Sequence, residues 1–497
     1  RRGPVFDKGR WRMLMRRVWS WVLAVAVSVA VGAGSASAAE DEDYYELMKL
    51  FVDTFEQIDR NYVKEVDRKE LVEAAMRGML NKLDPYSSYF DNKELKEFNE
   101  QVEQEFGGIG IQVSLDPKGR QLMVLSPIPG TPAYKAGIKA GDRIVEIDGK
   151  ATAEFGEGKE MDTAVKMMRG TPGSPVKVTV VHEGSEEPTT LELLRAVIKT
   201  PTVLGDHFDS SGEWSYFIEG ADKIGYIRLT HFSRNSAAEV EDALKSLQKQ
   251  GMKALILDLR FNPGGLLTSA TAISDLFVED GVIVSTKGRN TDEQVATATK
   301  EGTYTGFPMV VLVNRYSASA SEIVSACLQD HKRALVVGER TWGKGSVQNV
   351  IELDGGQSAL KLTTASYHRP SGKNIHRFPN SKETDEWGVM PDEGYLVKFS
   401  TEDMQKYLEY RRQRDILGGE RSEKPVEFTD LQVAKGIEWL KAELAKADEK
   451  KTESPEKTAE EKKDEKKDSA PKGQDEPKGG ASVEFFRQLP WRPAHRG

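Results

Sequence analysis

Residues 317–348 have the sequence SASASEIVSACLQDHKRALVVGERTWGKGSVQ. The preceding residues, FPMVVLVN at 307–314, form a continuous apolar and largely β-branched run, which is typical of a buried parallel strand. Ser319 to Glu322 fits a helix capping box, apolar residues follow at helical spacing, and ALVVG at 334–338 predicts the next strand. Ser319 is therefore expected where a strand gives way to a helix. The unpaired N–H groups of such a helix start, that of Ala320 first, can stabilise an oxyanion.

Lys344 follows Ser319 by 25 positions and suggests the chemistry of the pair. A serine hydroxyl becomes a strong nucleophile when a base takes its proton, and a lysine is such a base only while it is neutral. Lowering a lysine pKa from about 10.4 to about 7 requires roughly 5 kcal/mol of desolvation, so Lys344 is expected to be buried. No carboxylate lies between Thr341 and Gln348, and the Gln348 amide can bind the amine without charging it.

The spacing alone leaves a simpler interpretation open, in which Ser319 is only a helix cap, Lys344 a solvated loop residue and Gln348 an ordinary polar residue before a strand. A second segment favours the chemical interpretation. Residues 253–265, KALILDLRFNPGG, predict a buried strand that runs into two adjacent glycines. Such glycines let the backbone approach a ligand closely and can supply a second oxyanion donor, although a tight left-handed turn would use them equally well.

Several segments together resemble the C-terminal processing, or tail-specific, peptidases, which are serine peptidases with a Ser-Lys-Gln site and an embedded PDZ domain. The resemblance covers residues 44–398, roughly two-thirds of the chain. Its segments are LDPYSSYF (83–90), FGGIGI (106–111), GYIRLTHFS (225–233), DLRFNPGG (258–265), SASASE (317–322), VGERTWGKGSVQ (337–348), LTTASYHRPSG (362–372) and MPDEG (390–394).

The resemblance implies roles for six residues. They are Ser319 as nucleophile, Lys344 as base, Gln348 as the residue that positions the base, and Gly264 or Gly265 with Ala320 as the oxyanion hole. It also implies an α/β fold with a crotonase-like spiral parallel-sheet catalytic domain, an inserted PDZ domain that is small and β-rich with helices, and an N-terminal helical region. The repeated strand–loop–helix units of the sequence permit this fold.

The expected PDZ domain begins at a glycine-rich hexapeptide. Its residues are Phe106, Gly107, Gly108, Ile109, Gly110 and Ile111, which resemble a loop whose N–H groups capture a peptide C-terminus while the peptide adds as a strand. Residues 161–169 have helical spacing and would line the groove, or serve only as a core helix. By the resemblance, Arg169 at the end of this helix would couple the PDZ domain to the protease site.

Other chemistries find less support. The seven histidines have no metal-ligand spacing, and no phosphate-binding loop occurs, so neither a metal nor an organic cofactor is expected. Sequence order does not exclude a Ser-His-Asp triad, for which His331 and His368 are the candidates. His331 is more simply explained as a charge partner of a helix C-terminus.

The length and composition agree with a packed protein of several domains. A length of 497 residues predicts two to four domains, and 38% hydrophobic residues permit a packed core. A net charge of -9 argues against nucleic-acid binding. Cys327 is the one cysteine, so no intrachain disulfide forms, and its place on an apolar helix face predicts that it lies in the core.

The N-terminus predicts export. Arg16 and Arg17 precede an apolar run at 18–33, and Ala36-Ser37-Ala38 supplies a small-residue cleavage pattern, so residues 13–38 (Met13–Ala38) resemble a signal peptide. The mature protein is then periplasmic or secreted. An uncleaved leader would leave it membrane-associated.

The expected domains follow from these observations. They are a leader (1–38), an N-terminal helical region (39–100), a PDZ domain (101–185), a catalytic serine peptidase domain (186–400), a C-terminal helical region (401–446) and a disordered charged tail (447–497), whose composition offers little apolar surface for folding. The amphipathic N-terminal helices either form a homodimer or larger oligomer or pack on their own catalytic domain.

These features predict a periplasmic or secreted serine endopeptidase that binds the free apolar C-termini of proteins in its PDZ domain and cleaves through a Ser-Lys acyl-enzyme. Its partners are protein substrates, copies of itself and an activator or adaptor protein. One alternative is a catalytically silent PDZ scaffold, which would not need a buried lysine. Another is an acyl-transfer enzyme for small molecules, in which the PDZ-like segment would have no purpose.

Overall fold

The computed structural model describes residues 43–116, 121–209, 211–290, 292–416 and 426–452. The chain divides into two compact units, residues 1–440 and 441–497. The expected leader at 1–38 and the chain beyond residue 452 lie outside the described residues. Within the described ranges, no helix has both the length and the apolar character needed to cross a membrane.

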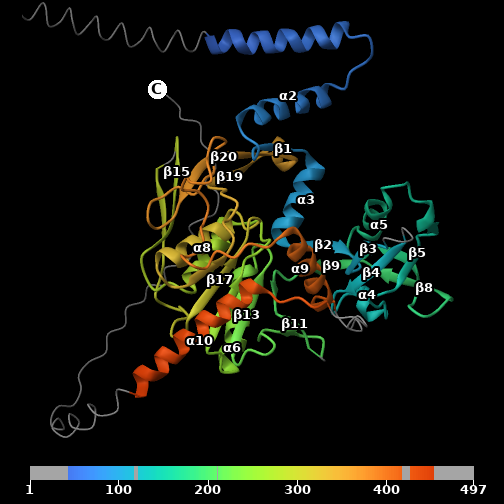
Figure 1. Cartoon of the computed structure of the whole chain (residues 1–497). Helices are drawn as coiled ribbons and strands as arrows, with labels where there is room; N and C mark the ends of the chain where they lie inside the picture. The colour runs from blue at the N-terminus through green and yellow to red at the C-terminus, as the bar shows by residue number, and fades with distance from the viewer. Residues whose placement is uncertain (1–42, 117–120, 210, 291, 417–425, 453–497) are drawn as a thin grey trace, which may run out of the picture. The chain divides into compact units, whose positions relative to one another are not determined.

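A mainly parallel sheet forms the centre of the first unit (Figure 1). Its strands, in spatial order, are β10 (Val203–Leu204), β13 (Ile224–Leu229), β14 (Ala254–Asp258), β17 (Met309–Val313) and β18 (Leu335–Gly338). The last four run parallel, and β10 pairs antiparallel with β13 at the edge. Every residue of β14 and β17 is buried, as their continuous apolar sequences predict.

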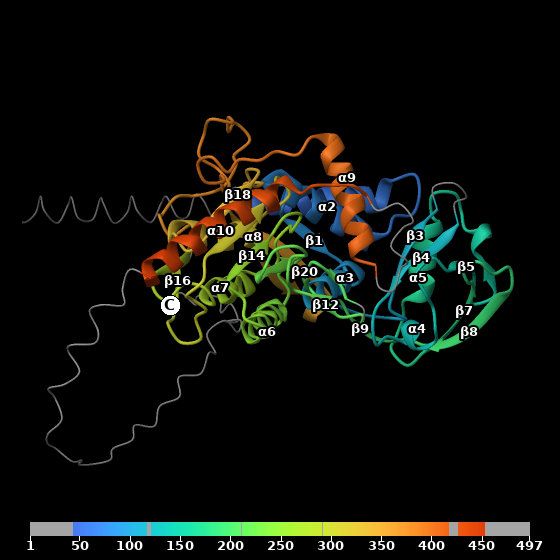
Figure 2. The ribbon, with the colours of Figure 1, turned by 60° about the horizontal axis from the view of Figure 1, so that its bottom comes forward.

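Helices cover both faces of this sheet (Figure 2). The helices of the first face are α6 (Ser236–Lys249), α7 (Leu267–Asp275) and α8 (Ala320–Asp330), and their buried side chains share one core with the sheet. Cys327 is part of this core and fully buried, which confirms its predicted place. On the other face, Gly436 of α10 (Leu431–Thr452) lies against Val310 and Ile256.

A second, antiparallel sheet carries the residues around Lys344. Its strands are β1 (Ser88–Phe90), β20 (Ser358–His368), β15 (Val282–Gly288) and β16 (Gln294–Thr297) in that order, with β19 (Ser346–Leu353) also paired to β20 and a short 3-10 turn η2 (Asp354–Gly356) between β19 and β20. Gln348 lies opposite Thr363 in the β19–β20 pair. Strand β1, which the sequence did not predict, brings an N-terminal segment to the same sheet.

The small β-rich domain has its own apolar core, separate from that of the parallel sheet. It comprises β3 (Ile111–Leu115), β4 (Leu122–Pro127), β5 (Arg143–Ile147), β6 (Lys150–Ala151), β7 (Pro175–Val181), β8 (Pro188–Leu194), the helices α4 (Pro132–Lys135) and α5 (Glu160–Met168), and the turn η1 (Thr152–Glu154). Strand β2 (Glu105–Gly108) precedes this segment and β9 (Ala196–Lys199) follows it, and the two strands pair with each other in a ribbon. This arrangement agrees with the predicted α/β fold and with a small β-rich domain inserted into it.

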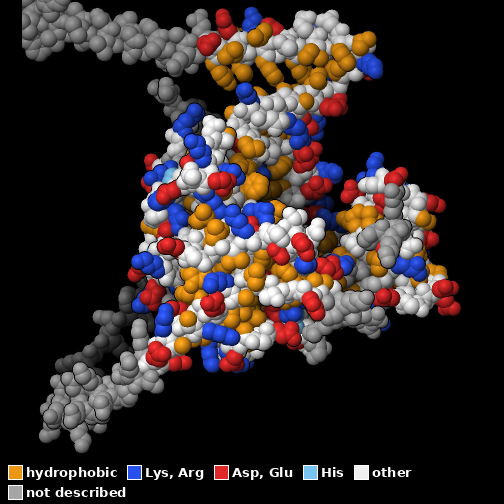
Figure 3. Space-filling model, viewed as in Figure 1, with side chains coloured by type: hydrophobic (Ala, Val, Ile, Leu, Met, Phe, Trp, Pro, Cys, Tyr) orange, Lys and Arg blue, Asp and Glu red, His pale blue; other side chains and the backbone are white. Residues whose placement is uncertain are grey.

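Among the residues that the structure describes, three helices precede this domain. The chain is helical at 43–61, in α2 (Arg68–Leu83) and in α3 (Asn92–Glu103). Apolar side chains gather along one side of the first helix (Figure 3), and those of Tyr44, Leu47, Leu50 and Phe51 are exposed.

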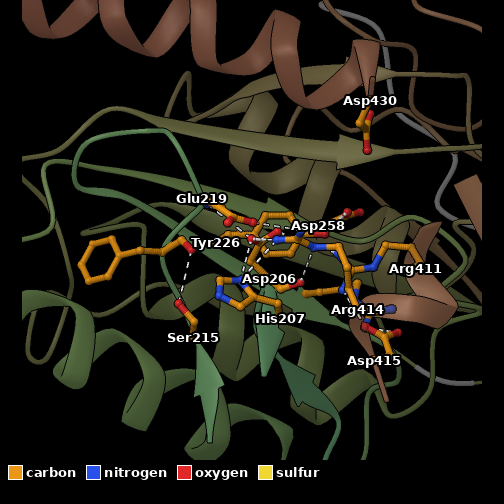
Figure 4. A network of polar contacts seen from close by, with 12 residues as sticks. Asp206, His207, Ser215, Glu219, Tyr226, Asp258, Arg411, Arg414, Asp415 and Asp430 are labelled. Carbon is orange, nitrogen blue, oxygen red and sulfur yellow. Dashed lines mark hydrogen bonds and ion pairs between the residues drawn. The ribbon is translucent and has the colours of Figure 1, made fainter. Parts of the chain in front are cut away.

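The C-terminal region of the first unit adds α9 (Thr401–Arg414), next to the two-residue strands β11 (His207–Phe208) and β12 (Trp214–Ser215). Figure 4 shows Asp206 between His207 and two arginines of α9, Arg411 and Arg414. Helix α10 continues to Thr452 instead of ending at Lys446, so the prediction of a disordered tail from residue 447 is wrong for its first residues, which are mostly good helix formers.

Candidate active site

Ser319 occupies a strained turn between β17 and α8. Its backbone has φ 55° and ψ −114°, a conformation that costs a non-glycine residue about 1–3 kcal/mol and that tends to occur at functional sites. Ser317 and Ser321 are both fully buried, and their hydroxyls donate to the carbonyls of Leu259 and Asn262 at 2.8 and 2.9 Å. Ser319 is the one of the three that is partly exposed, so it alone is available to a substrate.

The two glycines after β14 lie against this turn. A Cβ on Gly264 would be 2.8 Å from the Cβ of Ser319, so only glycine fits there. The Gly264 N–H already donates to the Asn262 side chain at 2.8 Å. Within the described part of the chain, the N–H groups of Gly265 and Ala320 donate to no protein acceptor. The geometry therefore favours Gly265 over Gly264 as the partner of Ala320 in an oxyanion hole.

Lys344 lies in the loop between β18 and β19, where it is partly buried. Its Nζ atom is 5.3 Å from the centre of the Tyr86 ring. Burial, reinforced by the charge of Lys361, lowers the pKa of Lys344 to about 8, while Glu322 and Asp84 oppose this shift. A substantial fraction of the amine is therefore neutral near pH 8, as a general base requires.

Glu322 connects the serine turn to the lysine loop. Its Oε2 atom accepts hydrogen bonds from the backbone N–H groups of Ser319 and Lys344, both at 2.8 Å. Its Oε1 atom accepts from the Thr341 hydroxyl and the Gly343 N–H, both at 2.6 Å. Burial raises the pKa of Glu322, and these four hydrogen bonds act against that shift because they favour the carboxylate.

Tyr367 of β20 makes a second connection between the same two segments. Its hydroxyl contacts the carbonyl oxygens of Ser319 and of Lys344, the former at 3.1 Å. The side chain is almost fully buried, and this burial raises the pKa of Tyr367 well above its ordinary value, so the phenol keeps its proton. Ser319 and Lys344 are thus held through both their N–H and their carbonyl groups.

Gln348 lies in β19, and its Nε2 atom donates to the hydroxyls of Ser346 at 2.9 Å and Thr363 at 3.1 Å. Among the described residues, no hydrogen bond joins the Lys344 amine to Gln348 or to Ser319. Catalytic hydrogen bonds are often long in the absence of substrate and shorten when it binds. The carbonyl oxygen of the Gln348 amide is the atom left to accept from the lysine.

The histidines do not complete a triad with Ser319. His331 caps α8, and its Nε2 atom lies 2.8 Å from the Val282 carbonyl, while His368 has no hydrogen bond to Ser319 within the described ranges. His376 is closer to the lysine loop, where its Nδ1 atom accepts from the Gly345 N–H at 3.2 Å. No group of three His, Cys, Asp or Glu residues in the described ranges is arranged to hold a metal ion.

The predicted peptide-binding hexapeptide is divided between two strands. Phe106 to Gly108 belong to β2 and pair with β9, Ile109 and Gly110 form the turn, and Ile111 begins β3. Strand β3 is at the edge of its sheet and pairs only with β4, so a peptide strand could add to it. Helix α5 contacts β3, in the position expected for the other side of a groove.

Arg169 directly follows α5, as the sequence predicts, but its side chain contacts residues of α3 and β2 and not the serine turn. Its Nη1 atom lies 3.1 Å from a carboxylate oxygen of Glu100 in α3, and its guanidinium lies 4.4 Å from the centre of the Phe106 ring. These partners place Arg169 next to the β2–β9 ribbon, and no described contact joins it to Ser319 or Lys344.

Sequence reasoning missed several residues of the site. Tyr86, Thr363 and Tyr367 lie in the segments LDPYSSYF and LTTASYH, which the sequence singles out only as strings that resemble the family. Glu322 was recognised as half of a capping box, but not as the acceptor for the lysine loop. Tyr86, Thr363 and Tyr367 are far from Lys344 in the sequence, and the second sheet brings their segments together, whereas Glu322 comes from α8.

Comparison with known proteins gives matches over most of the chain. Residues 223–393 match the model of peptidase family S41, residues 123–181 that of a PDZ domain, and residues 21–94 that of the activating protease CtpB N-terminal domain. The carboxy-terminal-processing protease of Bartonella bacilliformis is 36% identical over 415 residues, which cover 82% of this chain and 91% of the relative.

Two further similarities complete the comparison. The carboxy-terminal processing protease CtpA of Bacillus subtilis is 39% identical over 325 residues, or 65% of each chain. A solved structure of a photosystem II D1 C-terminal processing protease is 31% identical, covers 70% of this chain and 92% of its own, and aligns with a TM-score of 0.38.

Proposed function

The chain belongs to the carboxy-terminal processing proteases of peptidase family S41, and we propose that it captures the free C-termini of proteins and cleaves upstream through an acyl-enzyme on Ser319. It is a serine-type peptidase that carries a PDZ domain. The observation that carries the mechanism is the position of Ser319 in a strained, partly exposed turn. Glu322 joins the backbone of this turn to the backbone of Lys344, whose pKa is about 8.

In the first step, neutral Lys344 accepts the proton of the Ser319 hydroxyl as its oxygen attacks the scissile carbonyl. The negative charge that develops on the carbonyl oxygen is stabilised by the N–H groups of Gly265 and Ala320. Lys344 then gives the proton to the departing amine, and an ester on Ser319 remains. Water hydrolyses this ester with Lys344 again as base, and Gln348 holds the amine in place through its carbonyl oxygen.

The PDZ domain supplies the selectivity for protein tails in this proposal. A substrate tail would add to the open edge of β3, beside α5, and the N–H groups at the turn of Ile109 and Gly110 would bind its carboxylate. Backbone pairing makes the recognition tolerant of sequence, while an apolar last residue would be selected by the groove.

The protein's location and assembly are also part of the proposal. The export signal suggested by residues 13–38 supports a periplasmic or secreted enzyme. Exposed apolar side chains on the helix at 43–61 support a homo-oligomer, since large apolar patches on soluble proteins commonly mark interaction surfaces. An activator or adaptor protein would act by moving the PDZ domain.

The alternative function is a PDZ scaffold that binds tails without cleaving them. Cleavage of an unfolded protein with an apolar free C-terminus separates the two functions when the enzyme is compared with Ser319→Ala and Lys344→Ala. We expect both variants to be inactive, and we expect the same substrate with an amidated C-terminus to be cleaved more slowly. Cleavage that survives Ser319→Ala contradicts the mechanism, and tail binding without cleavage by any form supports the scaffold.

A further inference from the structure

The segment directly after α2 makes contacts around the lysine base that the mechanism above does not use. Asp84 follows the last residue of α2, and its Oδ1 atom accepts from the N–H groups of Tyr86 and Ser87 at 2.7 and 2.8 Å. Its Oδ2 atom accepts from the Ser87 hydroxyl at 2.8 Å. The carboxylate therefore fixes a tight turn, residues 84–87, beside β20.

This turn is bonded to Thr363 of β20. The Thr363 N–H donates to the Ser87 hydroxyl oxygen at 3.1 Å, and the hydroxyl oxygens of Ser87 and Thr363 lie 3.4 Å apart, within hydrogen-bonding reach. Although burial raises the pKa of Asp84, hydrogen bonds from the Ser87 hydroxyl and from the backbone of Tyr86 and Ser87 hold it below its ordinary value. Asp84 is therefore a carboxylate, which only accepts hydrogen bonds.

A chain of donors and acceptors follows from that charge. Because Asp84 only accepts, the Ser87 hydroxyl gives it its single proton, so the Thr363 hydroxyl can turn its own proton to the Ser87 oxygen and keep its oxygen to accept from a neighbour. That neighbour is the Nε2 atom of Gln348, at 3.1 Å. The orientation of the Gln348 amide is thereby determined: its NH2 group faces Thr363, and its carbonyl oxygen is the group left for the Lys344 amine.

The same turn also covers the amine itself, because the Tyr86 ring lies 5.3 Å from Lys344 Nζ. Other charged or titratable groups face the amine from each neighbouring element. They are Glu322 on α8, Lys361 on β20, Asp84 after α2, and His376, whose ring packs edge-on against Tyr86 at a centroid distance of 6.3 Å. The turn thus contributes both an orienting charge and a wall of the site.

We propose that the turn at 84–87 is a positioning element of the catalytic base, in which Asp84 orients Gln348 through Ser87 and Thr363, and Tyr86 covers the Lys344 amine. The inference rests on the proposed function, because it assigns these residues a role in the same reaction. It also makes the N-terminal helix α2 part of the active-site architecture, since Asp84 is the residue at which that helix ends.

Two substitutions test the orienting chain in the full-length enzyme. Asp84→Asn keeps an oxygen for the turn amides but presents an NH2 group where the carboxylate accepted from Ser87, so the Ser87 hydroxyl can turn its proton to Thr363 and Gln348 loses its defined orientation. Thr363→Val removes the hydroxyl, whereas Thr363→Ser keeps it and serves as the matched control. We expect kcat to fall roughly tenfold to a hundredfold in the first two, because small errors in positioning carry costs of this size, and to change little in Thr363→Ser.

The pH dependence distinguishes positioning from general damage. Asp84→Asn removes a negative charge that favours the protonated lysine, so the rising limb of kcat against pH should move to lower pH even as kcat falls. Tyr86→Leu should move the limb to higher pH by admitting water to the amine, while Tyr86→Phe keeps the ring and should leave the limb in place. Loss of folding alone would move neither limb.

The outcomes are separable from those of the proposed function. If Ser319→Ala still cleaves, the mechanism itself fails, whatever the other variants do. If Ser319→Ala is inactive but Thr363→Val matches the wild type, or Thr363→Ser loses as much activity as Thr363→Val, the positioning role is overturned. Thermal unfolding checks that each variant is folded. If Asp84→Asn does not fold, the comparison of Thr363→Val with Thr363→Ser is sufficient to test the positioning role.

Discussion

The backbone N–H groups of Ser319 and Lys344 donate to the same carboxylate oxygen, Oε2 of Glu322, each at 2.8 Å. The nucleophile and its base lie on separate segments, and one buried acceptor fixes the distance between those segments. Tyr367 contacts the carbonyl oxygens of the same two residues. The pair is therefore organised before a substrate arrives.

Glu322→Gln should impair both stability and activity. The amide keeps one acceptor oxygen but turns an NH2 group toward two of the four donors, and each buried donor left unpaired costs about 1–3 kcal/mol. We expect denaturant unfolding to show a loss of about 2–5 kcal/mol and kcat to fall by roughly two orders of magnitude.

Glu339→Gln is the matched control for this change. Glu339, the residue after β18, is also buried and accepts from the Phe399 N–H at 3.0 Å and from Arg315 at 3.0 Å, but its carboxylate accepts from neither the Ser319 nor the Lys344 backbone. Its loss should destabilise the protein without a specific fall in kcat. An equal fall in kcat for both variants would contradict the role of Glu322.

The three serines of the SASAS segment should separate activity from stability. Ser319→Ala should abolish cleavage and leave the fold intact, because its hydroxyl is needed for attack. Ser321→Ala removes a buried hydrogen bond to the Asn262 carbonyl and should cost about 1 kcal/mol in thermal unfolding, and Ser317→Ala should cost about 2 kcal/mol because its hydroxyl also accepts from the Asn314 N–H at 2.9 Å; cleavage should persist in both. Loss of cleavage in a stable Ser317→Ala enzyme, with activity retained in Ser319→Ala, would reverse the assignment.

Replacing Lys344 with methionine should increase stability as it removes activity. Because burial lowers the folded-state pKa of Lys344 from 10.5 to about 8, the charged lysine opposes folding. That penalty, at most about 3 kcal/mol, is fully present below pH 8 and disappears as the pH rises through 10.5, where the amine is neutral in both states.

Urea unfolding of Lys344→Met at neutral and at high pH measures this effect. The stability gain should appear at about pH 7 and fade by about pH 10. Lys253→Met, at an exposed position, is the control and should show no such gain. A loss of stability in Lys344→Met at neutral pH would show that the lysine is not held in an unfavourable environment.

Alanine at the two glycines near Ser319 should be far more damaging than at a comparable glycine elsewhere. A Cβ on Gly265 would lie 2.2 Å from the Phe232 carbonyl oxygen, and one on Gly264 would lie 2.7 Å from that of Ala318. Gly302 also has a positive φ, +79°, but open space around it. Gly302→Ala should therefore cost only about 1–2 kcal/mol of backbone strain and keep its activity in a cleavage assay, while the other two lose theirs.

The local elements of the fold were predictable from the sequence because their signals are local. The apolar run at 307–314 contains β17, the capping box begins α8 at Ala320, and the apolar helix face buries Cys327. Within the active site, the spacing in the sequence indicated Ser319 and Lys344. In the structure, Ser319 is preferred to Ser317 and Ser321 because it is the partly exposed serine of the three.

The remaining parts of the site depend on contacts between distant segments. Nothing near Lys344 in the sequence indicates that Tyr86 covers its amine, or that Tyr367 contacts its carbonyl, because Tyr86 is brought there by the pairing of β1 with β20 and Tyr367 lies in β20 itself. The choice between Gly264 and Gly265 depends on which N–H the Asn262 side chain occupies. Such details are decided by hydrogen-bond partners, which sequence patterns do not specify.

The proposed reaction depends on Ser319 as the nucleophile and Lys344 as its base. The most direct test is labelling of the full-length enzyme with a serine-directed fluorophosphonate from about pH 6 to about pH 10, with the modified residue identified by mass spectrometry. We expect a single adduct on Ser319, a labelling rate that rises with a midpoint at about pH 8, and a large loss of rate in Lys344→Met. An adduct on another residue, or an unchanged rate in Lys344→Met, would overturn the assignment of nucleophile and base.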